Sequence, residues 1–125
     1  MTESQEQMLL VEKCRNYDWR LKEAGLKESG IGRLLHVPNG GLRTKSEAAK
    51  LKAMGVVAGA ADIFVPVPSG GWHGLWIEMK QGAGRVAKVQ EEFGQAMIDA
   101  GYAWAACWGH EEAWRVVCNY MGINE

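Results

Sequence analysis

Two carboxylates and an ammonium group lie close together in the middle of the sequence. Asp62 opens an apolar segment, and Glu78 and Lys80 stand two residues apart in the next one. Side chains two apart on a strand share a face, and a hairpin between the segments would bring Asp62 opposite them. Carboxylates this close repel each other unless a cation holds them, and Mg²⁺ takes such oxygen ligands together with water and phosphate oxygens. The pattern predicts metal-assisted hydrolysis of a phosphodiester, with Lys80 steadying a water or the scissile phosphate.

The same residues also have a structural interpretation. Glu78 and Lys80 would form an ion pair on the solvated face of a half-exposed sheet, and Asp62 would cap a turn. Gln90, on the apolar stripe of a helix, would be a buried amide, and Glu3 a favourable charge at a helix N-terminus. This interpretation needs four separate coincidences, so the sequence favours one shared site.

Helices and strands alternate along the chain. Capping-box patterns begin two of the helices, at Thr2 with Gln5 and at Thr44 with Glu47. The turn residues at 68–71 predict an antiparallel hairpin between the two middle strands. Predicted helices cover 2–24, 48–54, 86–100 and 110–121, and predicted strands cover 33–37, 62–67, 72–80 and 102–108. We therefore expect one α/β domain spanning residues 1–125.

The first predicted helix carries polar groups on its buried line. Its apolar stripe contains Leu10, Cys14 and Tyr17, and helical steps backward from Leu10 reach Gln7 and then Glu3. Glu3 therefore joins the candidate site residues, and Glu6, one turn away, is the alternative acid.

Composition places the chain among single-domain globular proteins. It has 125 residues, of which 47% are hydrophobic, and 14 Lys and Arg residues stand against 15 Asp and Glu residues. A domain of this size buries roughly two-thirds of its unfolded surface and needs neither disulfides nor a structural metal. Cys14, Cys107 and Cys118 are odd in number and far apart, which predicts buried free thiols in a reducing compartment. The sequence has no secretion signal and no membrane span, so we expect a cytosolic protein.

Basic residues gather in two blocks despite the net charge of −1. They fit phosphate contacts or ordinary solvated surfaces equally well. The turn at Asn39, Gly40 and Gly41 lies beside the first block, which favours contact with DNA there. The blocks contain Arg33, Arg43, Lys45, Lys50 and Lys52, then Lys80, Arg85 and Lys88; the candidate DNA contacts are Asn39, Arg43, Lys45, Arg85 and Lys88.

The remaining aromatic residues and histidines carry weaker signals. Trp76 shares its strand face with Glu78 and would wall the site, whereas Trp104 and Trp108 are expected in the core or at a dimer contact. The three histidines are dispersed, without the spacing of a zinc site.

The motifs resemble a known family of nucleases. Gly55-x-x-x-Gly59-x-x-Asp62, followed by Ile77-Glu78-Met79-Lys80 and then Gln90, resembles the PD-(D/E)xK nuclease superfamily. More closely, the chain is similar to the VRR-NUC group, the virus-type replication-repair nucleases, whose small stand-alone members occur in phages and bacteria. Segments 3–7, 36–41 and 94–101 and Arg43 share this resemblance. Ala61 stands where the family usually has proline, a change in turn rigidity that removes no ligand.

This resemblance implies a fold and a site. The fold would be a restriction-endonuclease-like α/β core, a mixed sheet flanked by helices. Asp62 and Glu78 would bind Mg²⁺ or Mn²⁺, Lys80 would be the catalytic lysine, Gln90 a helical site residue and Glu3 an additional catalytic acid.

The resemblance also implies an activity. The protein would be a metal-dependent endodeoxyribonuclease, a homodimer similar in organisation to Holliday-junction resolvases, acting on branched DNA in the cytoplasm of a bacterial or phage-infected cell. No separate base-reading module is evident, which favours recognition of DNA shape and backbone. The alternatives are a non-catalytic nucleic-acid-binding or assembly protein with the same fold, and a sequence-specific or RNA-directed nuclease.

Overall fold

The structure is a computed structural model that describes residues 1–38 and 44–125. The predicted turn at Asn39, Gly40 and Gly41, and the candidate DNA contact Arg43, lie outside the described residues. The elements in chain order are α1 (Glu3–Glu23), the 3₁₀ helix η1 (Ile31–Arg33), β1 (Leu35–His36), α2 (Lys45–Ala53), β2 (Ile63–Val65), β3 (Leu75–Lys80), α3 (Lys88–Asp99), β4 (Ala103–Trp108) and α4 (His110–Met121).

The four strands form one mixed sheet in the order β1-β2-β3-β4. β1 pairs with β2 and β2 with β3 in antiparallel fashion, the second pair being the predicted hairpin. β4 runs parallel to β3, because α3 carries the chain back across the sheet between them. The predicted α/β fold with a mixed sheet flanked by helices is confirmed.

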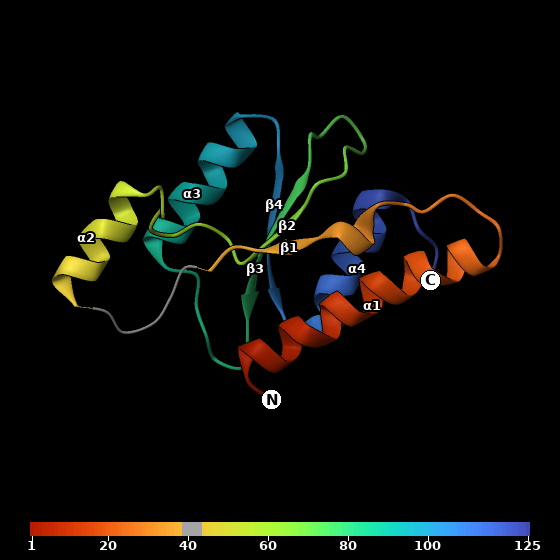
Figure 1. Cartoon of the computed structure of the whole chain (residues 1–125), viewed down its shortest axis with the longest axis horizontal. Coiled ribbons are helices and arrows are strands. Elements are labelled where there is room, and N and C mark those ends of the chain that lie inside the picture. Colours follow the sequence, from red (N-terminus) through yellow and green to blue (C-terminus); the bar gives the residue numbers. More distant parts are fainter. Residues whose placement is uncertain (39–43) are drawn as a thin grey trace.

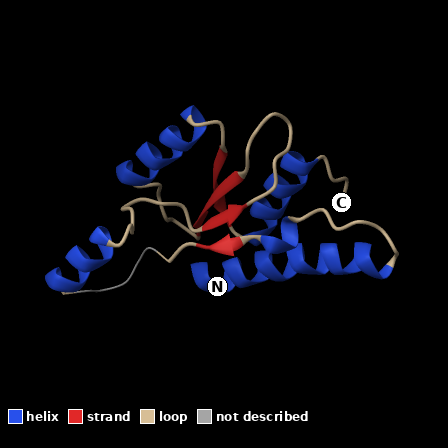
Figure 2. Cartoon of the chain, turned by 45° about the horizontal axis from the view of Figure 1, so that its top comes forward, coloured by secondary structure: helices blue, strands red, loops and turns tan. Residues whose placement is uncertain are grey.

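Helices cover both faces of this sheet (Figure 1). α1 and α4 pack together on one face, where the apolar side chains Leu75, Ile77 and Met79 of β3 are buried. α3 lies on the other face against β4. α2 stands beyond α3, away from the α1 and α4 layer, and has no buried residue (Figure 2). The alternation of side chains along β3 thus separates the apolar core from the face that carries Glu78 and Lys80.

Local hydrogen bonds explain where several elements begin. Thr2 and Gln5 form the predicted reciprocal capping box of α1. α3 begins at Lys88, later than predicted, and the Gln90 side chain accepts a hydrogen bond from the backbone N–H of Ala87 at its start. Thr44 caps α2 through the backbone N–H of Glu47.

β1 is shorter than the predicted strand 33–37, because the chain before it is held in a tight turn. The buried Asp18 carboxylate accepts hydrogen bonds from the backbone N–H groups of Ser29, Gly30 and Gly32. This turn continues into η1, which ends at Arg33. The 3₁₀ helix therefore occupies the first position of the predicted strand.

Close packing joins α3 to β4. A Cβ atom at Gly94 would lie 2.6 Å from the Trp104 ring, so only glycine lets the α3 backbone approach this closely. Trp104 is half-buried there, whereas Trp108 at the end of the same strand is 40% exposed and lies outside the core. Cys14, Cys107 and Cys118 are buried free thiols, as predicted. No helix in the described chain is both long and apolar enough to span a bilayer.

Candidate active site

The candidate residues meet at one end of the sheet, where β2 begins and β3 ends. Asp62 directly precedes β2, and the pairing of Ile63 with Ile77 places it across from Glu78. Its Oδ2 atom accepts a 2.7 Å hydrogen bond from the backbone N–H of Met79. The Asp62 carboxylate is therefore held at Met79, between Glu78 and Lys80 of β3, as the hairpin pattern predicted.

Glu78 and Lys80 are buried side chains. Glu78 is 3% exposed and Lys80 is 8% exposed. The interpretation of these residues as a solvated surface pair is therefore wrong. Trp76, on the same face of β3, packs against Phe64 and Phe93, with ring centroids 4.5 and 5.2 Å apart, so an aromatic cluster precedes Glu78 on this face.

Gln90 connects the lysine to the glutamate. Lys80 Nζ donates a 2.8 Å hydrogen bond to Gln90 Oε1, and Gln90 Nε2 donates a 3.2 Å hydrogen bond to Glu78 Oε2. Lys80 Nζ is also 3.8 Å from Glu78 Oε2. Because both ends of the amide are engaged, α3 sets the position of the ammonium group relative to the carboxylate.

The pKa of Glu78 reflects its burial and the charged groups around it. Burial raises the pKa of Glu78 to about 8, and the neighbouring Asp62 carboxylate contributes to this rise. The ammonium group of Lys80 lowers the pKa of Glu78, and the charge of Glu3 raises it. A positive charge beside Glu78 would therefore favour the ionised form of this carboxyl group.

This donor set fits a hard divalent cation. Glu78 Oε1 is buried and has no hydrogen-bond partner among the described residues, so this carboxylate oxygen is left unsatisfied and has lone pairs to offer a cation. Mg²⁺ commonly uses one or two protein carboxylates and completes its shell with water and substrate phosphate, which matches Asp62 and Glu78. Within residues 1–38 and 44–125, no three His, Cys, Asp or Glu side chains form a ready-made ligand cluster.

The structure separates the two acids of the first helix. Glu6 Oε2 accepts a 2.6 Å hydrogen bond from the backbone N–H of His110 and lies 2.5 Å from His110 Nδ1. These contacts tie Glu6 to the start of α4, and the hydrogen bonds from His110 lower the pKa of the Glu6 carboxyl group. Glu3 is exposed, yet its charge acts on Glu78. Of the two acids, Glu6 is thus engaged by α4, and Glu3 stays the candidate acid of α1.

Sequence reasoning missed the role of His36 on β1, which lies between Gln7 of α1 and the backbone of Asp62. His36 Nδ1 lies 2.9 Å from the Asp62 carbonyl oxygen and 2.9 Å from Gln7 Nε2. A ring nitrogen either donates or accepts, so the tautomer decides which contact is a hydrogen bond. The backbone N–H of Val37 also donates to the Asp62 carbonyl. Gln7 is a polar residue on the buried stripe of α1, and this position was the sequence feature from which a polar partner could have been predicted.

Comparison with solved structures identifies the fold. No family model and no curated protein sequence matches the chain. A solved structure described as "VRR_NUC domain protein" superposes with a TM-score of 0.80 and 24% sequence identity, covering 100% of this chain and 92% of that one. The chain has the VRR_NUC fold. The resemblance drawn from the motifs is thus confirmed for the fold.

Two of the candidate DNA contacts, Arg85 and Lys88, follow the candidate site in the chain of this VRR_NUC fold, whereas Lys45 lies on the outlying α2. Arg85 and Lys88 are exposed in the loop after β3 and at the start of α3. This loop passes close to the site, because a Cβ atom at Gly84 would lie 3.8 Å from Lys80 Cδ. Lys45 is exposed at the start of α2. Asn39 and Arg43, the other candidate DNA contacts, lie outside the described residues.

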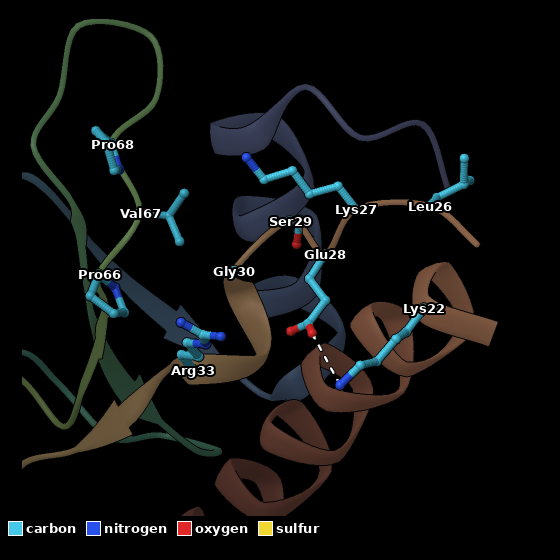
Figure 3. Close-up of a pocket in the computed structure, with 10 residues that line it drawn as sticks. All are labelled: Lys22, Leu26, Lys27, Glu28, Ser29, Gly30, Arg33, Pro66, Val67 and Pro68. Atoms are coloured by element: carbon cyan, nitrogen blue, oxygen red, sulfur yellow. Dashed lines mark ion pairs between the residues drawn. The ribbon is translucent and has the colours of Figure 1, made fainter. Parts of the chain in front are cut away.

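A cavity of about 590 Å³ lies at the opposite end of the sheet (Figure 3). Pro66, Val67 and Pro68, which follow β2, form one wall, whereas Asp62 precedes that strand. Its charged lining includes Arg33 and Lys22, the latter paired with Glu28 at 3.4 Å. None of the candidate site residues of the VRR_NUC fold lines this cavity, so it is separate from the proposed chemistry.

Proposed function

We propose that the chain is a VRR-NUC nuclease, a metal-dependent endodeoxyribonuclease selective for branched DNA such as Holliday junctions. One observation carries this proposal: Asp62, Glu78, Lys80 and Gln90 lie together on one face of a VRR_NUC fold. Glu78 and Lys80 are buried and Asp62 beside them is half-buried. Burying a carboxylate and an ammonium group next to a second carboxylate costs free energy that a purely structural role would not explain. The arrangement is typical of a site built to hold a cation and a phosphate.

Each residue of the site has a role in this proposal. Asp62 and Glu78 would hold Mg²⁺ or Mn²⁺, which when bound polarises the phosphoryl oxygen and makes a bound water more acidic. Lys80 would place its ammonium group beside the charge that develops on the scissile phosphate. Gln90 positions Lys80 through the 2.8 Å hydrogen bond between them. Glu3 would add a further acid at the edge of the site.

The substrate and the assembly follow from charge and resemblance. The exposed side chains of Arg85, Lys88 and Lys45 would contact phosphates, and such contacts respond to the shape of DNA more than to its sequence. The similarity to small stand-alone VRR-NUC nucleases supports a homodimer in the cytoplasm that sets two sites against the two strands of a junction.

The proposal is tested by cleavage of matched linear, flapped and four-way-junction DNA with Mg²⁺ or Mn²⁺. We expect metal-dependent cleavage of the branched substrates, abolished by EDTA and by Asp62→Ala, because this substitution removes a metal ligand. Circular dichroism of Asp62→Ala checks that the variant is folded. A folded protein that binds DNA but cuts none of these substrates would support the non-catalytic alternative instead.

Separate substitutions of Glu3 and Glu6 test the role of the first helix. Glu3→Gln is expected to lower the cleavage rate roughly 10- to 100-fold without changing the thermal midpoint, because Glu3 acts near the site and is exposed. Glu6→Gln is expected to lower the midpoint and retain the cleavage rate, because Glu6 binds the start of α4. Equal cleavage rates in wild type and Glu3→Gln would remove Glu3 from the mechanism.

The pH dependence of stability gives an independent check on Glu6. Its pKa is lowered in the folded state, so its contribution to stability is present above the pKa of the unfolded chain and is lost as the pH falls through the folded value. The difference in midpoint between wild type and Glu6→Gln should therefore shrink in acid. A difference that grows in acid would contradict this assignment.

A further inference from the structure

An exposed indole ring borders the proposed active site. β3 and β4 are parallel, and Trp108 is the residue paired with Lys80. Directly paired residues of neighbouring strands point to the same face of a sheet, so Trp108 lies beside Lys80 on the face that carries Glu78. Trp108 is 40% exposed, whereas Lys80 is 8% exposed. The indole therefore forms the open edge of the site next to the buried ammonium group.

The position of this ring is fixed by hydrogen bonds. Trp108 Nε1 donates to the carbonyl oxygen of Gly84 at 2.9 Å, and the backbone N–H of Trp108 donates to Glu112 Oε2 at 3.1 Å. The only polar atom of the indole is thereby satisfied within the protein. What remains for a ligand is apolar ring surface in a preset orientation, which lowers the entropy cost of binding.

Cations flank the exposed ring. The Gly84 carbonyl belongs to the loop that leads to the exposed Arg85 and then to Lys88. An aromatic surface beside cations that track phosphates is the combination by which proteins bind unpaired nucleotides. Trp76 and Trp104 are half-buried against neighbouring rings or α3 and do not combine these features.

We infer that Trp108 is a stacking platform for an unpaired base of the DNA strand that enters the site. The inference rests on the proposed nuclease function and deepens it by naming the substrate class: DNA in which nucleotides next to the scissile phosphate are unpaired, as at a flap or an opened junction. A fully paired duplex keeps its bases stacked on one another and offers none to the ring.

The test compares binding of a flapped duplex and a fully paired duplex, with Ca²⁺ in place of Mg²⁺. Trp108→Ala is expected to weaken binding of the flapped DNA roughly 5- to 150-fold and to change duplex binding much less. Trp108→Phe should retain most of the flap affinity, because it keeps a ring while losing the hydrogen bond to Gly84. Trp19→Ala, on α1, removes an indole that is 60% exposed and should leave both affinities unchanged.

The substitutions separate stacking from a structural role of the ring. Equal losses in Trp108→Phe and Trp108→Ala would mean that the residue only holds the loop, and would overturn the inference. Dimer dissociation in Trp108→Ala, measured by sedimentation velocity without DNA, would assign the ring to a contact between copies and would also overturn it.

A direct contact can be mapped without any cleavage. Flapped DNA carrying 5-bromodeoxyuridine in its unpaired strand is irradiated with the protein, and the cross-linked peptide is identified by mass spectrometry. We expect the cross-link at Trp108, whereas cross-links confined to other residues would overturn the inference. Absence of DNA binding by the wild-type protein would contradict the proposed function itself, an outcome distinct from binding that is insensitive to Trp108.

Discussion

Lys80→Ala is expected to lower the rate of DNA cleavage about 100- to 1,000-fold while leaving the fold and DNA binding largely intact. The physical reason is that the substitution removes a charge that would act on the transition state and keeps both carboxylates of the proposed metal site. The Lys80 ammonium group is held by Gln90 and lies 3.8 Å from Glu78, so its position is fixed before substrate arrives. Single-turnover cleavage of junction DNA with Mg²⁺ measures the effect.

Two measurements make this prediction specific. Lys22→Ala removes a lysine that lies on α1 beside the cavity of Figure 3, at the far end of the sheet, and should cleave at the wild-type rate. Binding of the same DNA with Ca²⁺ should be similar for wild type and Lys80→Ala. A wild-type cleavage rate in Lys80→Ala would exclude the lysine from the mechanism, and a matching loss of binding would make it a contact for DNA instead.

Asp18→Asn is expected to lower the free energy of unfolding by about 3 kcal/mol at neutral pH. The buried carboxylate accepts four hydrogen bonds: Oδ1 from the backbone N–H and hydroxyl of Ser29, and Oδ2 from the backbone N–H groups of Gly30 and Gly32. An asparagine has only one acceptor oxygen, so its NH₂ group would face two donors. Urea unfolding monitored by circular dichroism gives the free energy.

The effect of Asp18 should depend on pH. Burial raises the pKa of the Asp18 carboxyl group, but hydrogen bonds from Ser29, Gly32 and Gly30 outweigh this effect and lower the pKa overall. A carboxyl group with a lowered pKa stabilises the fold above the unfolded value of about 3.9 and loses this effect as the pH falls through the folded value. The difference between wild type and Asp18→Asn should therefore shrink below about pH 4.

Asp99→Asn is the matched control. Asp99 is exposed on α3 and accepts one hydrogen bond, from Gln95. Its substitution should change the free energy of unfolding by less than about 0.5 kcal/mol. Equal effects of Asp18→Asn and Asp99→Asn would show that the turn before η1 does not depend on the buried carboxylate.

The sequence by itself determined the order of the elements and the local part of the site. The Thr2 capping box and the apolar stripe predicted α1, and the turn residues at 68–71 predicted the antiparallel pairing of β2 with β3. That hairpin is local, and the strand period is fixed at two, so the sequence could place Asp62 beside Glu78 and put Lys80 on the same face. Burial of Glu78 and Lys80 did not follow from this pattern, because an exposed face has the same spacing.

Tertiary structure decided the contacts that join distant elements. The hydrogen bonds of Gln90 to Lys80 and Glu78 exist because α3 packs across the sheet face. Glu6 meets His110 across 104 positions of the chain, which only the packing of α1 against α4 explains. The exposure of Trp108 likewise depends on where β4 ends relative to α3. A sequence pattern fixes which face a side chain takes, whereas its partners and its burial depend on which elements pack over that face.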